Sequence, residues 1–212
     1  MEILVEISVA LIEGDHIKIL ELTNKALEMG IPHEEIYRKG LIKGMDVVGE
    51  KFKNNEVWMP EVMLSARAMN LCLEILEPLM KKSGALNIGK FVIGTVEGDL
   101  HDVGKNMVAM MMKGAGFEVI DLGINVSPEK FIKVIRNENP KIMGMSSLLT
   151  TTMVKMASTI EAIRISGLRN QIKIMVGGAP VSQVFADEIG ADGYASDSAQ
   201  GVEKARELIG LK

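Results

Sequence analysis

The sequence of 212 residues contains a single cysteine, Cys72. One thiol cannot form a disulfide framework within the chain or a thiolate-bound metal cluster, and a lone cysteine beside apolar helix positions is more often packed than reactive. No apolar run approaches the roughly 20 residues of a membrane-spanning helix. The opening residues, MEILVE, lack the basic segment of a secretory signal peptide. We therefore expect a cytoplasmic protein with no membrane partner.

The sequence also has no excess of positive charge and few aromatic side chains. Lys and Arg number 24 against 28 Asp and Glu, which gives a net charge of −4. A nucleic-acid partner requires a basic surface, so this balance argues against one. Aromatic residues make up only 4% of the chain, whereas methionine occurs 16 times. Methionine is flexible and polarizable, so these residues serve either as core filler or as the lining of an apolar surface that opens and closes.

Two common cofactor motifs and a paired catalytic base are absent. The sequence has neither a G-x-G-x-x-G turn after its first predicted strand nor a G-x-x-x-x-G-K-[ST] loop. These absences argue against a nicotinamide dinucleotide and against hydrolysis of ATP or GTP. Of the three histidines, His16 and His33 fall at caps or exposed positions of predicted helices. His101 with its neighbouring carboxylates provides too few ligands for a zinc site.

Residues 1–83 are predicted to be helical throughout. Their apolar residues recur at helical spacing, and Gly14-Asp15 and Gly30 give the signals that end one helix and begin another. The last helix opens at Pro60 and carries an unbroken apolar seam. The seam consists of Val62, Ala66, Met69, Leu73, Leu76 and Met80. Four helices with short connections favour a four-helix bundle.

A polar, glycine-containing break at 84–89 is the expected linker between two domains, 1–83 and 90–212. Beyond the break, short apolar runs alternate with helical patterns. Strands are expected at 90–96, 118–122, 141–146, 172–176 and 192–195, and helices at 103–115, 127–138, 151–166, 181–189 and 198–209. The alternation predicts an α/β domain with a doubly wound, five-stranded parallel sheet of the Rossmann or flavodoxin-like kind. Ligands of such sheets bind beyond the carboxyl ends of the strands.

The stretch 97–106 lies between the first predicted strand and the helix that follows it. It places His101 two residues after Asp99, in a loop at the ligand-binding edge of the sheet. Asp99 can accept the N–H of one imidazole nitrogen and leave the other nitrogen to bind a metal. A single protein nitrogen is enough when a macrocycle supplies the other ligands. The alternative is a hydrogen-bonded loop histidine that caps the helix together with Asp102.

Three separated motifs then carry a resemblance. Asp99-x-His101-x-x-Gly104 is followed after 41 residues by Ser146-x-Leu148, and after 28 more by Gly177-Gly178. This pattern resembles the cobalamin-binding signature D-x-H-x-x-G, S-x-L, G-G. Residues 44–52 and 59–67 resemble the helical cap of the same family. The chain is similar to the corrinoid proteins of methyltransferase systems that demethylate methylamines, methanol, betaines or aryl methyl ethers, and to the cobalamin-binding module of methionine synthase.

The resemblance implies a role for individual residues. His101 would be the lower axial ligand of the corrin cobalt in place of the cofactor's own base, with Asp99 and Thr152 forming the catalytic relay behind it. Phe52, Met59 and Val62 would cover the upper face of the corrin. The remaining cofactor-binding positions, which surround the corrin and its nucleotide tail, would be Gly98, Leu100, Asp102, Val103, Gly104, Ser146, Leu148, Thr150, Gly177, Gly178, Ala195 and Ser198.

The implied function is that of a methyl carrier which is not catalytic alone. It would bind cobalamin in the base-off, His-on form, as methyl- or hydroxocobalamin. It would shuttle a methyl group on cobalt between a substrate-specific methyltransferase and a second methyltransferase that acts on a thiol or tetrahydrofolate. A corrinoid reductive activase would be a further partner. Substrate choice would belong to the partner enzyme.

Two other classes of cobalamin protein share parts of this pattern. A cobalamin-binding sensor normally adds a DNA-binding helix-turn-helix, whereas residues 1–83 here match the helical cap. The cobalamin subunit of a carbon-skeleton mutase carries the Asp-x-His-x-x-Gly motif but normally lacks this cap. The bound cofactor distinguishes the classes, because methyl- or hydroxocobalamin favours the carrier and adenosylcobalamin favours the other two.

Overall fold

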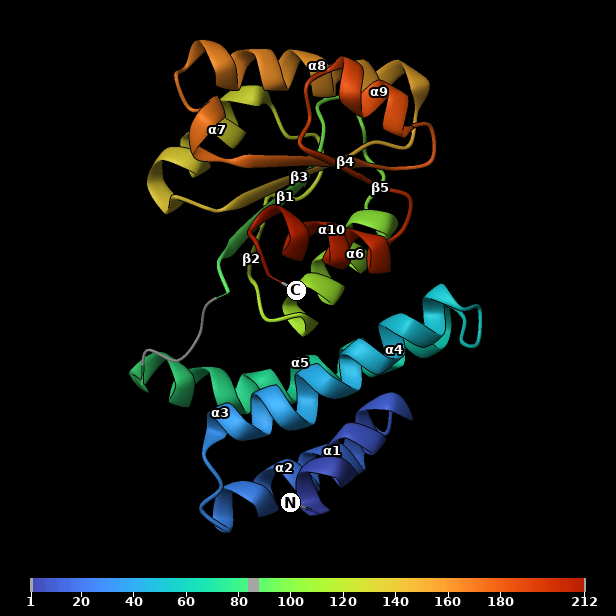
Figure 1. The fold of residues 1–212 in the computed structure, drawn as a ribbon, viewed down its shortest axis with the longest axis vertical. Helices are drawn as coiled ribbons and strands as arrows, with labels where there is room; N and C mark the ends of the chain where they lie inside the picture. Colours follow the sequence, from blue (N-terminus) through green and yellow to red (C-terminus); the bar gives the residue numbers. More distant parts are fainter. Residues whose placement is uncertain (1, 84–87, 212) are drawn as a thin grey trace. The chain divides into compact units, whose positions relative to one another are not determined.

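A computed structural model describes residues 2–83 and 88–211, and it divides the chain into two compact units. One unit comprises residues 1–87 with 114–116, and the other comprises 88–113 with 117–212. We call them the helical unit and the α/β unit (Figure 1). Most of the expected linker at 84–89 lies outside the described residues.

The helical unit contains four helical stretches, as the sequence predicts. They are α1 (Glu2–Ile12), α2 (His16–Glu28), a continuous third stretch of α3 (His33–Glu35), η1 (Ile36–Ile42) and α4 (Lys43–Lys53), and α5 (Met59–Ser83). Asp15 caps α2 by accepting hydrogen bonds from the amides of Ile17 and Lys18. Five of the six predicted seam positions of α5 are buried, and the sixth, Met80, lies outside the side chains that the structure describes. The predicted seam therefore does face the core of this unit.

The third stretch differs from its prediction in one respect, because Ile36–Ile42 form a π-helix. A π-helical turn accommodates an extra residue without breaking the apolar stripe, so residue spacing alone does not reveal it. Two glycines on this stretch allow α1 to come close. A Cβ atom at Gly40 would lie 2.9 Å from Cγ2 of Ile7, and one at Gly44 would lie 3.0 Å from the carbonyl oxygen of Ser8.

The α/β unit is built on an entirely parallel five-stranded sheet with the order β2-β1-β3-β4-β5. This is the doubly wound, flavodoxin-like order, which confirms the predicted fold class. The strands are β1 (Lys90–Thr95), β2 (Glu118–Asp121), β3 (Ile142–Ser146), β4 (Lys173–Gly177) and β5 (Gly193–Ala195). The winding direction changes between β1 and β3, and ligands of such sheets bind where this change occurs. The loops after β1 and β3 are therefore the first place to look for a site.

Four α-helices and one short 3₁₀ turn connect the strands, and a fifth α-helix follows β5. They are α6 (Val103–Gly114), α7 (Pro128–Glu138), α8 (Thr150–Ile165), η2 (Arg169–Gln171), α9 (Gln183–Glu188) and α10 (Ser198–Leu208). Helices α7, α8 and α9 cover one face of the sheet, and α6 and α10 cover the other (Figure 1). Each regular element begins and ends within about two residues of its predicted bounds, apart from the 3₁₀ turn, which the sequence analysis did not predict.

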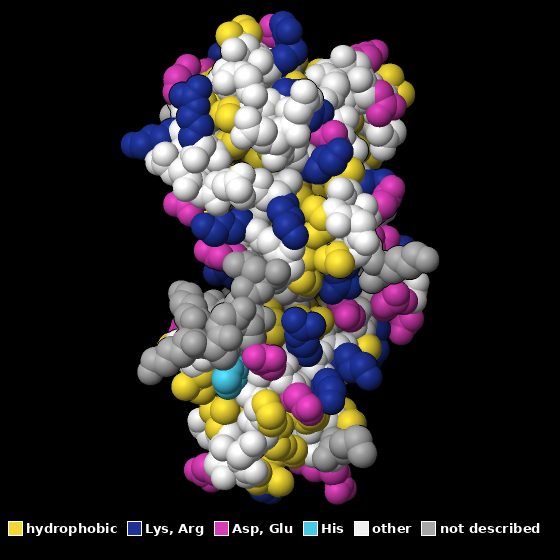
Figure 2. All heavy atoms as spheres, turned by 60° about the vertical axis from the view of Figure 1, so that its left-hand side comes forward, with side chains coloured by type: hydrophobic (Ala, Val, Ile, Leu, Met, Phe, Trp, Pro, Cys, Tyr) yellow, Lys and Arg dark blue, Asp and Glu magenta, His cyan; other side chains and the backbone are white. Residues whose placement is uncertain are grey.

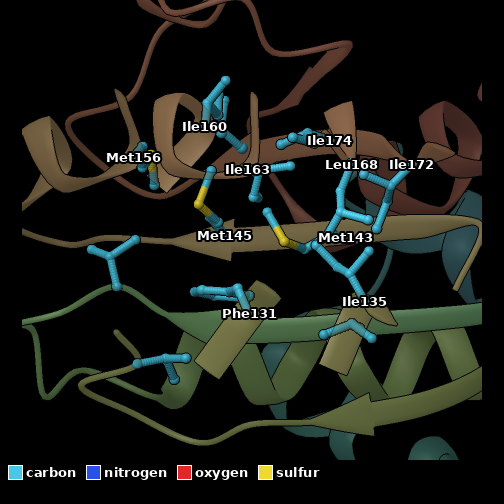
Figure 3. Packing of buried hydrophobic residues seen from close by; sticks show 14 of the residues in the cluster. Phe131, Ile135, Met143, Met145, Met156, Ile160, Ile163, Leu168, Ile172 and Ile174 are labelled. Carbon is cyan, nitrogen blue, oxygen red and sulfur yellow. The ribbon is translucent and has the colours of Figure 1, made fainter. Parts of the chain in front are cut away.

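The core between the sheet and α7–α9 is aliphatic and rich in methionine. Met143 and Met145 of β3 point toward Phe131 of α7 on one side and toward Ile160 and Ile163 of α8 on the other (Figure 3). Methionine adapts its shape to irregular gaps, so this core closes with Phe131 as its one fully buried phenylalanine. The packed core thus supports the strands whose carboxyl ends carry the loops.

The surface agrees with the charge balance of the sequence. On the face drawn in Figure 2, basic and acidic side chains are intermixed over both units and form no uniformly basic region. Within the described residues, we find no helix with the length and apolar character needed to cross a lipid bilayer.

Candidate cofactor-binding site

The loop from Val96 to Asp102 carries the predicted histidine at the carboxyl end of β1. Its tight path depends on Gly98, which has a φ angle of +81°, a region that side-chain-bearing residues rarely adopt. Thr95, the last residue of β1, donates a hydrogen bond from its hydroxyl to the carbonyl oxygen of His101 at 2.8 Å. The backbone carbonyl oxygen of Asp102 accepts a hydrogen bond from the amide of Asn106 at 2.7 Å, where α6 begins. Both ends of the loop are thus fixed.

One oxygen of the Asp99 carboxylate orients His101. Oδ1 lies 2.8 Å from Nδ1 of the imidazole and accepts the His101 amide at 3.0 Å. The Asp99 side chain is fully buried, whereas the His101 side chain is 51% exposed. Since Nδ1 is engaged with the carboxylate, Nε2 is the nitrogen that can bind a ligand. The pair therefore presents one oriented nitrogen at the edge of the sheet.

The other oxygen of Asp99 is held by the segment after β3. Oδ2 accepts hydrogen bonds from the amide of Leu148 at 2.8 Å, from the hydroxyl of Thr152 at 2.7 Å and from the hydroxyl of Ser147 at 3.1 Å. Burial by itself raises the pKa of this carboxyl. The hydrogen bonds from Thr152, Leu148 and His101 outweigh the burial and place the Asp99 pKa well below its usual range. Asp99 is therefore a carboxylate at neutral pH.

The structure brings the central predicted residues into one network. Gly98, Asp99 and His101 belong to the loop after β1, Leu148 belongs to the loop after β3, and Thr152 belongs to the first turn of α8. Around them, Leu100, Val103 and Leu148 are exposed apolar side chains, with exposed fractions of 67%, 68% and 45%. Ile124 and Leu149, which the sequence analysis did not single out, are also exposed at this edge. The histidine thus stands among apolar side chains open to solvent.

The other predicted positions lie at the same carboxyl edge. Ser146 is the half-buried end of β3, and Ala195 ends β5. Thr150 is the exposed first residue of α8, and Ser198 is the buried first residue of α10. Asp102 and Gly104 are exposed at the start of α6.

The two consecutive glycines allow backbone segments to approach closely. A Cβ atom at Gly177 would lie 2.8 Å from the carbonyl oxygen of Ala195, and one at Gly178 would lie 1.9 Å from the carbonyl oxygen of Ser147. Gly178 also has a φ angle of +127°. A side chain at Gly178 would displace the segment that donates to Asp99, so this glycine is required for the network.

Sequence reasoning missed two residues of the network. Ser147 occupies the variable position of the Ser146-x-Leu148 motif, and the pattern gives that position no role. Asn125 has a φ angle of +51°, accepts the Gly98 amide on Oδ1 at 2.8 Å, and donates its own amide to the carbonyl oxygen of Asp99 at 3.0 Å. Its polarity within the turn after β2 was the available signal, because asparagine tolerates the left-handed conformation.

The three predicted cap residues belong to the helical unit. Phe52 is half-buried near the end of α4, Met59 is 39% exposed at the start of α5, and Val62 is fully buried in the seam of α5. Trp58, just before α5, is 66% exposed. Their placement over a cofactor remains a prediction.

The fold and the site define a class of protein. A doubly wound α/β unit presents one oriented histidine nitrogen at its switch point. Within residues 2–83 and 88–211, no group of three or more His, Cys, Asp or Glu side chains could hold a metal ion alone. A macrocyclic cofactor can supply the other ligands of a metal that is bound by one histidine.

Comparison with known proteins identifies that class. Residues 89–203 and residues 3–77 match two family models, each described as a B12 binding domain. A corrinoid protein of Desulfitobacterium hafniense is 44% identical over 99% of both chains. Trimethylamine corrinoid protein 1 of Methanosarcina acetivorans is 40% identical over 98% of this chain and 97% of its own length.

Solved structures agree with the sequence comparison. The methanol:cobalamin methyltransferase complex of Methanosarcina barkeri contains a chain that matches all of this one with a TM-score of 0.87 and 29% identity, over 81% of that chain. A cobalamin-binding protein from Desulfitobacterium hafniense matches 97% of this chain and 98% of its own, with a TM-score of 0.80 and 32% identity. The chain belongs to the B12-binding family, and its cofactor is a cobalamin-type corrinoid.

The residues present fit such a cofactor. His101 offers a single nitrogen, which is what a cobalt ion already held by a macrocycle requires. The exposed apolar side chains around it suit the apolar face of a corrin macrocycle. The close backbone approach at Gly177 and Gly178 keeps side chains out of this part of the carboxyl edge.

Proposed function

We propose that the chain is a corrinoid methyl carrier, which passes a methyl group between a substrate-specific methyltransferase and a second methyltransferase that acts on a thiol or tetrahydrofolate. The observation that carries the proposal is the Asp99–His101 pair, a buried carboxylate with an exposed imidazole held at 2.8 Å. When bound, the cofactor supplies a cobalt centre that holds the methyl group between two transfer reactions. The relatives named for trimethylamine and methanol systems support this role.

His101 would hold the cobalt through Nε2. Asp99 would keep the proton of the imidazole on Nδ1 and leave the lone pair of Nε2 for the metal. The bound form would be base-off and His-on, because the histidine would take the place of the cofactor's own base. A proton taken up by Nε2 would occupy the lone pair that binds the metal, while Asp99 would still hold the ring through Nδ1. The pair would thereby make ligation reversible.

The carboxyl edge of the sheet would hold the rest of the cofactor. Leu100, Val103 and Leu148 would lie against the corrin ring, since all three are apolar and exposed. The nucleotide tail would enter beside the ends of β3 and β4, where Ser146 and Thr150 offer hydroxyl groups. Gly177 and Gly178 carry no side chain that could block the entry.

The helical unit would act as a cap over the methyl-bearing face of the cofactor, through Phe52, Met59 and Val62. Exposed apolar side chains at the start of α5, with Trp58 at 66% and Met63 at 49%, support an apolar contact of this kind. A cap must be displaced when a methyltransferase binds. The partners would be the two methyltransferases and a corrinoid reductive activase, and the donor enzyme would determine the substrate.

The proposal is tested with His101→Gly in the full chain loaded with cobalamin. We expect loss of the nitrogen splitting from the lower axial ligand in the cobalt(II) EPR spectrum. A second measurement loads the protein with methylcobalamin whose methyl group carries a ¹⁴C label. The wild-type protein should retain the label and should release it to a thiol or tetrahydrofolate only when an acceptor methyltransferase is added. The variant should bind the cofactor more weakly and transfer the label more slowly.

His16→Gln is the matched control, because His16 opens α2 in the helical unit and has no proposed role at the cobalt. It should leave both the spectrum and the transfer unchanged. An unaltered nitrogen splitting in His101→Gly would refute the ligand assignment. Methyl carriage would be refuted if the wild-type protein did not retain the label, or did not pass it to the acceptor when the acceptor methyltransferase was added.

A further inference from the structure

Two buried hydroxyl groups, rather than one, face the same oxygen of Asp99. Thr152 Oγ1 lies 2.7 Å from Oδ2 and Ser147 Oγ lies 3.1 Å from it. The two hydroxyl oxygens are 2.8 Å apart. Ser147 is fully buried and Thr152 is 8% exposed. Both side chains therefore satisfy their hydrogen bonds within the protein.

The number of protons restricts how the two hydroxyls can act. Each has one proton to donate, and the acceptors within reach are Asp99 Oδ2, the other hydroxyl oxygen, and the carbonyl oxygen of Leu149 at 3.2 Å from Ser147 and 3.1 Å from Thr152. Both hydroxyls can donate to Asp99 at once, or one donates to Asp99 while the other donates to its neighbour or to Leu149. Each arrangement supplies the carboxylate with a hydroxyl donor.

The two donors come from structural elements that are fixed independently. The Ser147 amide donates to the carbonyl oxygen of Gly177 at 3.2 Å, so the end of β4 holds this residue. Thr152 lies in the first turn of α8, where its amide donates to the carbonyl oxygen of Leu149 at 3.1 Å. Loss of one hydroxyl therefore leaves the backbone that presents the other in place.

We propose that Ser147 is a positioning residue that substitutes for Thr152 as the hydroxyl donor to Asp99, so that either hydroxyl alone keeps the carboxylate aligned with Nδ1 of His101. The inference deepens the proposed function, and its value for cobalt ligation rests on His101 being the ligand. Alignment of the carboxylate itself is a property of the chain without cofactor. Ser147 thus gives the variable position of the Ser146-x-Leu148 motif a specific role.

The test is a double-mutant cycle with Ser147→Ala, Thr152→Val and the combination of the two, with Asp99→Asn as the reference for complete loss. The first readout is the fraction of His101 with its proton on Nδ1, measured by ¹⁵N NMR of the imidazole in the full chain without cofactor. The second is the nitrogen splitting in the cobalt(II) EPR spectrum of the loaded protein. A residue that only fills space would move neither.

Each single variant should change the ratio of the two imidazole tautomers by less than about threefold, and the double variant by more than about tenfold, which is a coupling expected of residues in one network. Ser147→Ala with Thr152→Ser should restore the wild-type ratio, because this pair keeps one hydroxyl. Additive effects would overturn the proposal. The proposal would also be overturned if Thr152→Val alone changed the tautomer ratio as much as Asp99→Asn does. This single variant provides the test if the double variant fails to fold.

The two readouts separate this inference from the proposed function. A cooperative loss of the Nδ1 tautomer together with no histidine nitrogen on cobalt in the wild type would uphold the role of Ser147 and refute His101 as the ligand. A histidine nitrogen on cobalt with no coupling between the two hydroxyls would uphold His101 as the ligand and refute the role of Ser147.

Discussion

At the scale of single residues, the pKa values of two buried acidic side chains are shifted in opposite directions. Asp99 has three donors on Oδ2 and remains ionised despite complete burial. Cys72 is equally buried, but its thiol is only 3.4 Å from one hydroxyl, that of Thr23. Burial raises the pKa of Cys72 to about 11, and the hydrogen bond with Thr23 opposes the rise only in part. The hydrogen-bond donors around each buried acid decide the direction in which its pKa shifts.

The Cys72 thiol should therefore react slowly with alkylating reagents. The thiolate is the nucleophile, and a pKa of about 11 leaves little of it at pH 8. We expect alkylation by iodoacetamide at pH 8 to be on the order of 100-fold slower in the native protein than in the urea-unfolded chain. Cys72 is the only cysteine, so total thiol loss measures this site alone. Equal native and unfolded rates would contradict its burial.

The same shift predicts the pH dependence of stability. The folded state holds the thiol proton more tightly than the unfolded state, whose cysteine pKa is about 8.5. The contribution is complete below about pH 8.5 and declines as the pH rises toward 11. Cys72→Ala should remove this part of the alkaline decline, measured as the difference between the free energies of unfolding of the two proteins across that range.

At the scale of elements, the site depends on how one loop braces another. Asn125, in the turn after β2, holds Gly98 through its side chain and Asp99 through its backbone. Asp121, the last residue of β2, accepts a hydrogen bond on its carboxylate from the ammonium group of Lys105 at 2.5 Å. Lys105 is buried and lies in the first turn of α6. The loop of His101 is thus supported from the β2 side as well as from β3.

Substitutions of Asn125 separate its two contributions. Asn125→Gly keeps the left-handed backbone but removes the hydrogen bond to Gly98, and we expect a loss of about 1 kcal/mol in the free energy of unfolding. Asn125→Ala adds a left-handed strain of roughly 1–2 kcal/mol and should be the less stable of the two. Asn125→Asp retains an acceptor and serves as the matched control, measured alongside by urea denaturation. If Asn125→Ala had the same free energy of unfolding as Asn125→Gly, the role of the left-handed backbone conformation would be contradicted.

Sequence patterns predicted the elements better than the connections between them. The strands and helices follow from apolar spacing, and Asp99 with His101 follows from their place after a buried strand. Ser147 was not predictable, because its role depends on the approach of Gly178, which follows β4 and is distant in sequence. The π-helix at Ile36–Ile42 was missed because its apolar stripe stays continuous. Contacts between loops that are distant in sequence leave no local pattern.

At the scale of the whole molecule, each of the two units has a buried core of its own. Ile7, Leu41 and Met69 are buried in the helical unit, and Phe131 and Met143 are buried in the α/β unit. The residues that would bind the axial side of the cofactor and its tail all belong to the α/β unit. A ligand stabilises the unit to which it binds, by an amount that depends on its concentration relative to its Kd.

Calorimetry of the full chain should therefore resolve two unfolding transitions without cofactor. Cobalamin at about 100 times its Kd should stabilise the α/β unit by about 2.7 kcal/mol and move its transition upward. His101→Gly should reduce this shift at the same cofactor concentration, whereas His16→Gln should not. If cobalamin raised the helical transition alone, the cofactor would be held chiefly by the helical unit. An equal rise of both would mean that the bound cofactor couples the units, as a cap that contacts it requires.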